Sequence, residues 1–158
     1  MEKRICIGNR WVGKNEPAFI IAEMSANHNM DFERAKEIIK GVKEAGADAV
    51  KLQTYTADTI TIDCDNDYFQ ITQGTLWDGT TLYKLYQKAY TPWEWQGELK
   101  KYAESMGLIC FSSPFDSTAV EFLENINVPA YKIASFEITD VPLIRKIARL
   151  GKPILIST

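Results

Sequence analysis

Five short apolar runs rich in β-branched residues recur along the chain, and segments of helical periodicity separate them. Runs this short, without polar alternation, are typical of strands buried on both faces. Strands that alternate with helices predict right-handed crossovers and a parallel sheet. The expected strands are residues 19–24, 49–54, 108–112, 130–133 and 153–157.

The segments between these runs carry the start and stop signals of helices. Over residues 31–45, apolar side chains recur at i, i+3, i+4 and i+7, and Gly46 follows as a stop signal. Thr91 and Glu94 form a T-x-x-E capping box, which predicts the start of a second helix that ends at Gly107. Two further helices are expected, over residues 117–125 and 141–150.

Two segments do not fit this repeat. Residues 1–18 precede the first core strand and contain the signals of a small hairpin around Gly8 and Asn9. The connection 55–90 is far longer than the roughly two to six residues of a usual βα loop, which predicts a functional excursion. The excursion is rich in aromatic residues, which either pack it onto the rest of the domain or contact a ligand.

Composition narrows the function classes. Of the 158 residues, 46% are hydrophobic and 25% charged, as in an ordinary soluble globular domain. The net charge of −3 provides no basic field for a nucleic acid or an anionic membrane, so the expected partner is a small molecule or another protein. The apolar runs are far shorter than the roughly 20 residues that span a bilayer. No leader is expected, because Arg4 and Arg10 flank no apolar stretch.

The cysteine, acidic and histidine residues indicate no metal site. Three widely spaced cysteines without a C-x-x-C pair predict reduced thiols in the cytoplasm, with neither a disulfide nor a zinc site. The acidic stretch 63–67 begins like a calcium loop but lacks the required glycine and the final glutamate. His28, the single histidine, is expected to be a solvated loop or cap residue, and no metal ligand is assigned.

Polar side chains occur at the carboxyl end of every expected strand. In an open doubly wound sheet, ligand groups gather at the switch point, so the outer strands have no reason to end this way. In a (β/α)8 TIM barrel every strand end faces one mouth. The pattern therefore predicts an α/β fold in which residues 19–158 form about five of the eight barrel strands, behind a cap segment 1–18. The polar residues, in strand order, are Glu23; Lys51 and Gln53; Ser112 and Ser113; Lys132, Ser135 and Glu137; Ser157 and Thr158.

Lys51 and Lys132 lie inside apolar strands, where an unpaired ammonium group is costly and two neighbouring ones repel each other. A shared phosphate or carboxylate would satisfy both, and serine hydroxyls would complete the anion site. Two alternatives stay open: Lys51 pairs with Glu23 in a structural role, or Lys132 is a Schiff-base nucleophile. Ser113, before Pro114, either belongs to the anion site or only ends its strand.

An ordered set of motifs resembles the phosphoenolpyruvate (PEP)-dependent sialic acid synthase family. A single motif of this kind would be weak, but the set covers almost the whole chain. The motif KIASFE around Phe136 is similar to the form found in the branch that makes pseudaminic acid. Sialic acid synthases usually have glycine at the position of Phe136. The matching segments are IIAEMSANHN (20–29), AGADAVKLQTYT (45–56), GTLWDGTTLYKLY (74–86), TPWEW (91–95), CFSSPFD (110–116), YKIASFEITD (131–140) and KPILIST (152–158).

This resemblance implies condensation of PEP with the open-chain aldehyde of an N-acetylated amino sugar, which gives a 2-keto sugar acid and phosphate. For the pseudaminic branch the sugar is a 2,4-diacetamido-2,4,6-trideoxy hexose; N-acetylneuraminate and legionaminic acid synthesis are the alternatives within the family. C3 of PEP attacks the aldehyde, water adds at C2, and a tetrahedral intermediate loses phosphate. A divalent metal ion (Mn2+, Mg2+ or Co2+) would polarise the aldehyde.

The resemblance also implies roles for particular positions. Glu23 matches a glutamate thought to handle proton transfer and to stabilise the cationic C2. Phe115 and Glu137 match positions that face the sugar. The residues that match PEP-binding positions, with Gln53 as their neighbour, are Lys51, Gln53, Ser113, Lys132, Ser135 and Ser157.

Other parts of the family are not expected in this chain. The two metal-binding histidines of the family lie on later barrel strands, and its C-terminal antifreeze-like domain reaches into the partner subunit of a homodimer. The expected metal ligands and dimer contacts thus lie outside these residues. The alternatives to a synthase are a Schiff-base aldolase and an inactive truncated barrel that only binds anions or assembles with another polypeptide.

Overall fold

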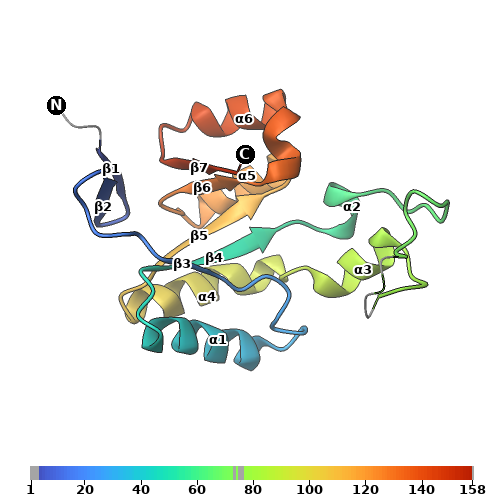
Figure 1. Cartoon of the computed structure of the whole chain (residues 1–158), viewed down its shortest axis with the longest axis horizontal. Coiled ribbons are helices and arrows are strands. Elements are labelled where there is room, and N and C mark those ends of the chain that lie inside the picture. Colours follow the sequence, from blue (N-terminus) through green and yellow to red (C-terminus); the bar gives the residue numbers. More distant parts are fainter. Residues whose placement is uncertain (1–3, 73, 75–76, 158) are drawn as a thin grey trace.

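The computed structural model describes residues 4–72, 74 and 77–157. Five strands form one parallel sheet, in which the spatial order follows the chain order. The sheet is curled, as Figure 1 shows. This is the architecture predicted for the first five strands of a (β/α)8 barrel. The strands are β3 (Ile21–Glu23), β4 (Ala49–Thr54), β5 (Ile109–Pro114), β6 (Tyr131–Ile133) and β7 (Ile154–Ile156).

Four helices cover the sheet in two pairs (Figure 1). The first pair, α1 (Phe32–Glu44) and α4 (Trp93–Ser105), shares one apolar cluster with β4 and β5. The second pair, α5 (Ser117–Asn125) and α6 (Val141–Ala148), shares another cluster with β5, β6 and β7. Burial of these apolar side chains is the main favourable term in the folding of the domain. Fully buried members are Ile39, Val50 and Leu99 in the first cluster and Leu123, Ile133 and Ile147 in the second.

The strand boundaries differ from the sequence expectation by one or two residues in four of the five strands, with the largest differences at the end of β5 and the start of β3. β5 continues past its predicted end at Ser112, because the ladder with β4 goes on through the pairs Gln53↔Ser113 and Thr54↔Pro114. Ser113 therefore lies within β5, which ends one residue later at Pro114, and its membership of the anion site stays a prediction. β3 begins at Ile21, later than expected.

The start of α4 also differs from its prediction. The prediction of a capping box at Thr91 and Glu94 is wrong, because the N-cap residue is Pro92 and no side chain caps the helix. The Thr91 hydroxyl lies 3.1 Å from Nε2 of His28 instead. A long-range hydrogen bond has thus replaced the local one that the motif predicted.

The predicted hairpin is present at the amino end of the sheet. Strands β1 (Arg4–Ile7) and β2 (Arg10–Gly13) pair antiparallel around Gly8 and Asn9. Figure 1 shows this hairpin apart from the carboxyl ends of the barrel strands. Ile7 is 5% exposed and belongs to the second apolar cluster, so the hairpin is packed onto the barrel strands.

Gly8 is required at the hairpin turn. Its φ is +59°, and a Cβ added there would lie 3.2 Å from Cδ1 of Ile109. We expect Gly8→Ala to destabilise the protein by about 1 kcal/mol or more in denaturant unfolding, since it combines left-handed strain with a steric contact. Gly46→Ala is the matched control, because Gly46 has φ +80° but nothing within 4 Å of the added Cβ. An effect of Gly8→Ala no larger than that of Gly46→Ala would contradict the contact.

The excursion between β4 and α4 contains two helices that the sequence analysis did not predict. These are α2 (Ala57–Ile60) and α3 (Leu82–Ala89), which lie beyond the carboxyl ends of the strands in Figure 1. The Tyr83 hydroxyl of α3 donates to Oδ1 of Asp58 on α2, at 2.7 Å. The aromatic residues of the excursion differ in burial, since Tyr55 is 3% exposed and Tyr68 is 91% exposed. Only some of them pack the excursion onto the domain.

Within the described residues, the structure has no helix whose length and apolar character would allow it to cross a membrane.

Candidate active site

The register of the sheet places several predicted site residues on one face. Glu23 pairs with Lys51 across β3 and β4, and Gln53 pairs with Ser113 across β4 and β5. Neighbours in a parallel ladder share a face, and residues two apart in a strand do so as well. Leu52, between the two β4 residues, packs into the helix-covered cluster. The polar set therefore occupies the opposite, inner face of the curled sheet.

The last two strands add a lysine and a serine to this face. Lys132 pairs with Leu155, so Ser157 lies two residues further along on the same side. Nζ of Lys132 donates to the Oγ of Ser157 and, at 2.8 Å, to the carbonyl oxygen of Ile133. We call this set the inner-face cluster, and its members lie on β3, β4, β5 and β6 or, for Ser157, directly after β7. Its members are Glu23, Lys51, Gln53, Ser113, Lys132 and Ser157.

Lys51 and Glu23 form an ion pair. Nζ of Lys51 lies 3.1 Å from Oε1 of Glu23, and the two side chains are 8% and 58% exposed. The structural pairing that the sequence left open therefore forms. An ammonium group has three donors, so the contact with Glu23 leaves Lys51 able to donate to an anion as well.

The two lysines interact electrostatically. Burial lowers the pKa of Lys132, and the Lys51 ammonium lowers it further, against the opposing effects of Glu23 and Glu137. A bound phosphate or carboxylate between the two lysines would relieve this repulsion. The cluster is therefore suited to an anion with more than one negative charge.

Two buried polar atoms have no hydrogen-bond partner among the described residues: Oγ of Ser113 and Oε2 of Glu137. A buried polar group without a partner costs about 1–3 kcal/mol, so each indicates a contact that a ligand would complete. Glu137 lies on the 3-10 helix η1 (Ser135–Thr139), which follows β6. Burial raises the pKa of Glu137, with a further increase from Asp140.

The other predicted site residues follow the strands that carry the inner-face cluster. Ser135 is exposed at the start of η1. Phe115 is half-buried directly after β5, where its ring meets Tyr55 edge to face at 5.4 Å. Thr158, which was named with Ser157 as a polar strand end, lies outside the described residues.

A buried polar network behind this face was missed by the sequence analysis. Oγ1 of Thr54 donates to Oε1 of Gln96 at 2.7 Å and lies 2.6 Å from Oγ of Ser112. Nε2 of Gln96 donates to the carbonyl oxygen of Gln53 at 3.1 Å. The Ser112 side chain thus points to the face of the sheet that α4 covers, and it is not part of the inner-face cluster. The network fixes the backbone of β4 next to Lys51.

His28 is fully buried, so its prediction as a solvated loop or cap residue is wrong. Its Nδ1 accepts from the backbone N–H of Met30 at 3.1 Å, which requires Nε2–H to donate to Thr91. Its ring also meets Trp95 edge to face at 5.8 Å. The neutral imidazole thus ties the loop after Glu23 to the start of α4.

This arrangement predicts a loss of stability in mild acid. Burial lowers the pKa of His28 below its ordinary value of 6.5. The unfolded chain therefore binds a proton that the folded chain does not, and stability falls as pH decreases from about 6.5 toward the folded pKa. We expect the melting temperature to fall more between pH 7.5 and 5.5 in the unmodified protein than in His28→Gln. Equal slopes for the two proteins would contradict this role.

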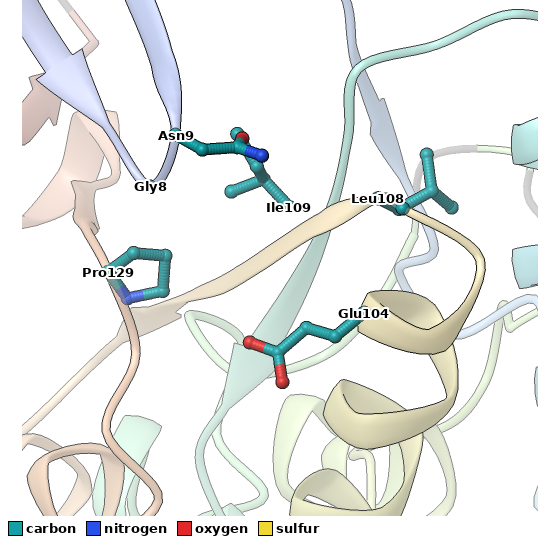
Figure 2. Close-up of a pocket in the computed structure, with 7 residues that line it drawn as sticks. Gly8, Asn9, Glu104, Leu108, Ile109 and Pro129 are labelled. Atoms are coloured by element: carbon teal, nitrogen blue, oxygen red, sulfur yellow. The ribbon is translucent and has the colours of Figure 1, made fainter.

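A second concave site lies at the opposite, amino end of the sheet (Figure 2). It is formed where the hairpin turn approaches the start of β5, and Figure 2 shows the carboxylate of Glu104 pointing toward it. Glu104 is paired with Lys100 at 2.7 Å, and the described lining residues include no cation. In a TIM barrel this end serves stability, whereas reactions occur at the carboxyl ends of the strands.

The described residues do not gather three or more His, Cys, Asp or Glu side chains that could hold a metal ion. We therefore assign no ligand set for Mn2+, Mg2+ or Co2+ to this part of the chain.

Comparison with known proteins decides the family. The profile described as the NeuB family matches residues 38–158, which is most of the chain. The chain belongs to the NeuB family. It is 56% identical over 143 residues to the pseudaminic acid synthase of Helicobacter pylori, and 48% identical over 152 residues to that of Campylobacter jejuni. These alignments cover 90% and 96% of this chain but only 42% and 43% of those two NeuB proteins.

A solved structure supports the fold. The N-acetylneuraminic acid synthetase of Leptospira borgpetersenii, crystallised with citrate, superposes with a TM-score of 0.82 at 28% identity. The match covers 99% of this chain and 50% of that one. The chain therefore shares the fold of about half of that synthetase, which agrees with the prediction of a partial barrel.

Proposed function

We propose that this chain provides the PEP-binding part of a pseudaminic acid synthase. The enzyme would condense PEP with a 2,4-diacetamido-2,4,6-trideoxy hexose to give pseudaminic acid and phosphate. The observation that carries the proposal is the inner-face cluster, in which two lysines and the free Ser113 hydroxyl share one face. The two relatives named above, both called pseudaminic acid synthase, support the choice of reaction.

The inner-face cluster suits both charged ends of PEP. Lys51 and Lys132 would hold the phosphate and carboxylate as charge-assisted donors, with hydroxyl donors from Ser113 and Ser157. Gln53 lies next to Ser113 in the register. Ser135, exposed after β6, would close the site from the mouth. Fixed donors of this kind stabilise the negative charge that develops on the leaving phosphate.

Glu23 would handle the proton and charge changes at C2 of PEP. When C3 attacks the sugar aldehyde, C2 becomes cationic, and a carboxylate nearby stabilises it. Glu23 would then assist the addition of water at C2, after which the tetrahedral intermediate loses phosphate. The ion pair with Lys51 holds Glu23 at the anion site. Phe115 and Glu137 would face the sugar.

The metal ion, the homodimer and the cytoplasmic location stay predictions. When bound, a divalent ion would polarise the sugar aldehyde. Because the described residues gather no three His, Cys, Asp or Glu side chains around one point, the steps above use only the chain's own side chains.

The test is phosphate release from PEP by the protein made from its complete reading frame, with Mn2+ or Mg2+ present. We expect release only when an acylated amino sugar is added, and fastest release with the 2,4-diacetamido-2,4,6-trideoxy hexose. If the protein prefers the sugar that leads to N-acetylneuraminate or to legionaminic acid, it would belong to that branch of the family instead. Sugar-independent release, or none, would contradict the synthase.

One observation favours a second candidate, a Schiff-base aldolase. The lowered pKa of Lys132 increases the fraction of free amine, which is the nucleophile in such enzymes. Borohydride added with a keto substrate would then leave a stable adduct on Lys132. Absence of an adduct would exclude this candidate and leave Lys132 as an anion-binding residue.

A further inference from the structure

Three aromatic side chains form a continuous wall from the excursion to the end of the sheet. The ring of Tyr86, on α3, meets that of Tyr55 edge to face at 5.5 Å, and Tyr55 meets Phe115 in the same way at 5.4 Å. Tyr55 is buried, whereas Tyr86 and Phe115 are partly exposed. Tyr55 therefore supports the two outer rings, which keep part of their surface exposed in what we call the aromatic wall.

The charge of Glu137 acts on the Tyr86 end of this wall. Burial raises the pKa of the Tyr86 phenol, and the charge of Glu137 raises it further. The phenol is therefore neutral and able to donate a hydrogen bond. Oε2 of Glu137 is buried without a partner among the described residues, so it is free to accept one from a ligand.

The helix that carries Tyr86 is held in place. Thr81 caps α3 by accepting from the backbone N–H of Lys84, at 3.3 Å. Tyr83 ties α3 to α2 through its hydrogen bond with Asp58. A fixed helix presents Tyr86 in one orientation, which selective recognition requires.

We infer that Tyr86 is a specificity-determining residue for the sugar, an inference that rests on the proposed function. An acetamido group combines an apolar methyl, which packs on aromatic rings, with an N–H that a carboxylate accepts. The aromatic wall takes the methyl group, and Oε2 of Glu137 accepts the adjacent N–H. A sugar with a second acetamido group and a 6-deoxy carbon therefore binds better here than one with hydroxyl groups at both positions.

The test compares Tyr86→Ala with the unmodified protein from the complete reading frame, in sugar-dependent phosphate release. We expect the KM for the 2,4-diacetamido-6-deoxy sugar to rise about tenfold, the typical effect of lost apolar contacts in a pocket. The KM for PEP should stay unchanged. The preference over a 2-acetamido hexose with hydroxyl groups at C4 and C6 should fall by a similar factor.

Two further variants make the result specific. Tyr86→Phe keeps the ring and should recover most of the preference. Tyr68→Ala is the matched control in the same excursion, since Tyr68 is 91% exposed, and it should behave like the unmodified protein. A Tyr86→Ala variant with unchanged sugar preference, or with equal changes in both KM values, would overturn the inference alone. Absence of sugar-dependent release in the unmodified protein would instead overturn the proposed function on which it rests.

Discussion

Replacement of Lys51 with methionine will weaken PEP binding by about 3 kcal/mol, which is somewhat more than a hundredfold. The Nζ of Lys51 is the most deeply placed cation of the inner-face cluster, on a side chain that is 8% exposed. Without the Lys51 ammonium group, Lys132 is the one lysine of the inner-face cluster that remains to bind the PEP anion. Methionine fills a similar volume, and the Glu23 left without its partner is 58% exposed and regains contact with water, so the cost to folding should be small. Titration calorimetry with PEP measures the effect.

Lys100→Met is the matched control for this variant. Lys100 is a similarly buried lysine, 12% exposed, and it is paired with Glu104 at 2.7 Å, but it lies on α4 away from the inner face. We expect its loss to leave PEP affinity unchanged, whereas Lys132→Met should resemble Lys51→Met. Equal PEP affinity in Lys51→Met and Lys100→Met would show that the ion pair with Glu23 is only structural.

Glu23→Gln will reduce kcat by about 10²- to 10⁴-fold, the range expected for loss of a general acid–base group. Glutamine keeps the size and a hydrogen-bond acceptor near Lys51, so PEP affinity should change by only a few fold. The reason is that Glu23 would stabilise the cationic C2 and assist the addition of water, whereas the lysines bind the anion. Steady-state kinetics with both substrates separate kcat from the two KM values.

Glu33→Gln is the control for this prediction, because Glu33 forms an exposed ion pair with Lys36 on α1. It should behave as the unmodified protein does. A Glu23→Gln variant with unchanged kcat but altered PEP affinity would mean that Glu23 only balances the charge of Lys51.

Most of the barrel could be predicted because its signals are local. Apolar runs without alternation identified all five strands, and the glycines after the helices marked their ends: Gly46, Gly107 and Gly151 all have positive φ. The capping box at Thr91 failed because a hydroxyl can bond to any donor or acceptor that folding brings near it. The partner was His28, 63 residues earlier in the chain.

The inner-face cluster could also be predicted, because strand alternation and the parallel order determine which side chains share a face. Lys51 and Gln53 are two apart, and Lys132 and Ser157 follow from the same rule on later strands. The roles of these residues came from the family resemblance and still need experiments.

What the sequence did not reveal depends on tertiary contacts. The burial of His28 comes from α4 and Trp95 packing over it, and no pattern around residue 28 indicates this. Likewise the apolar residues of α3 recur with helical spacing, at Leu82, Leu85, Tyr86 and Ala89, but that spacing did not indicate that Tyr86 packs against Tyr55. The aromatic content of the excursion was another signal, and it favoured packing onto the domain, with ligand contact as the alternative.

The central claim is that the inner-face cluster binds PEP. The most direct measurement is a crystal structure of the protein from the complete reading frame with PEP bound. We expect phosphate or carboxylate oxygens of PEP within hydrogen-bond distance of Nζ of Lys51, Nζ of Lys132 and Oγ of Ser113. PEP bound elsewhere, with Lys51 and Lys132 free of it, would contradict the account.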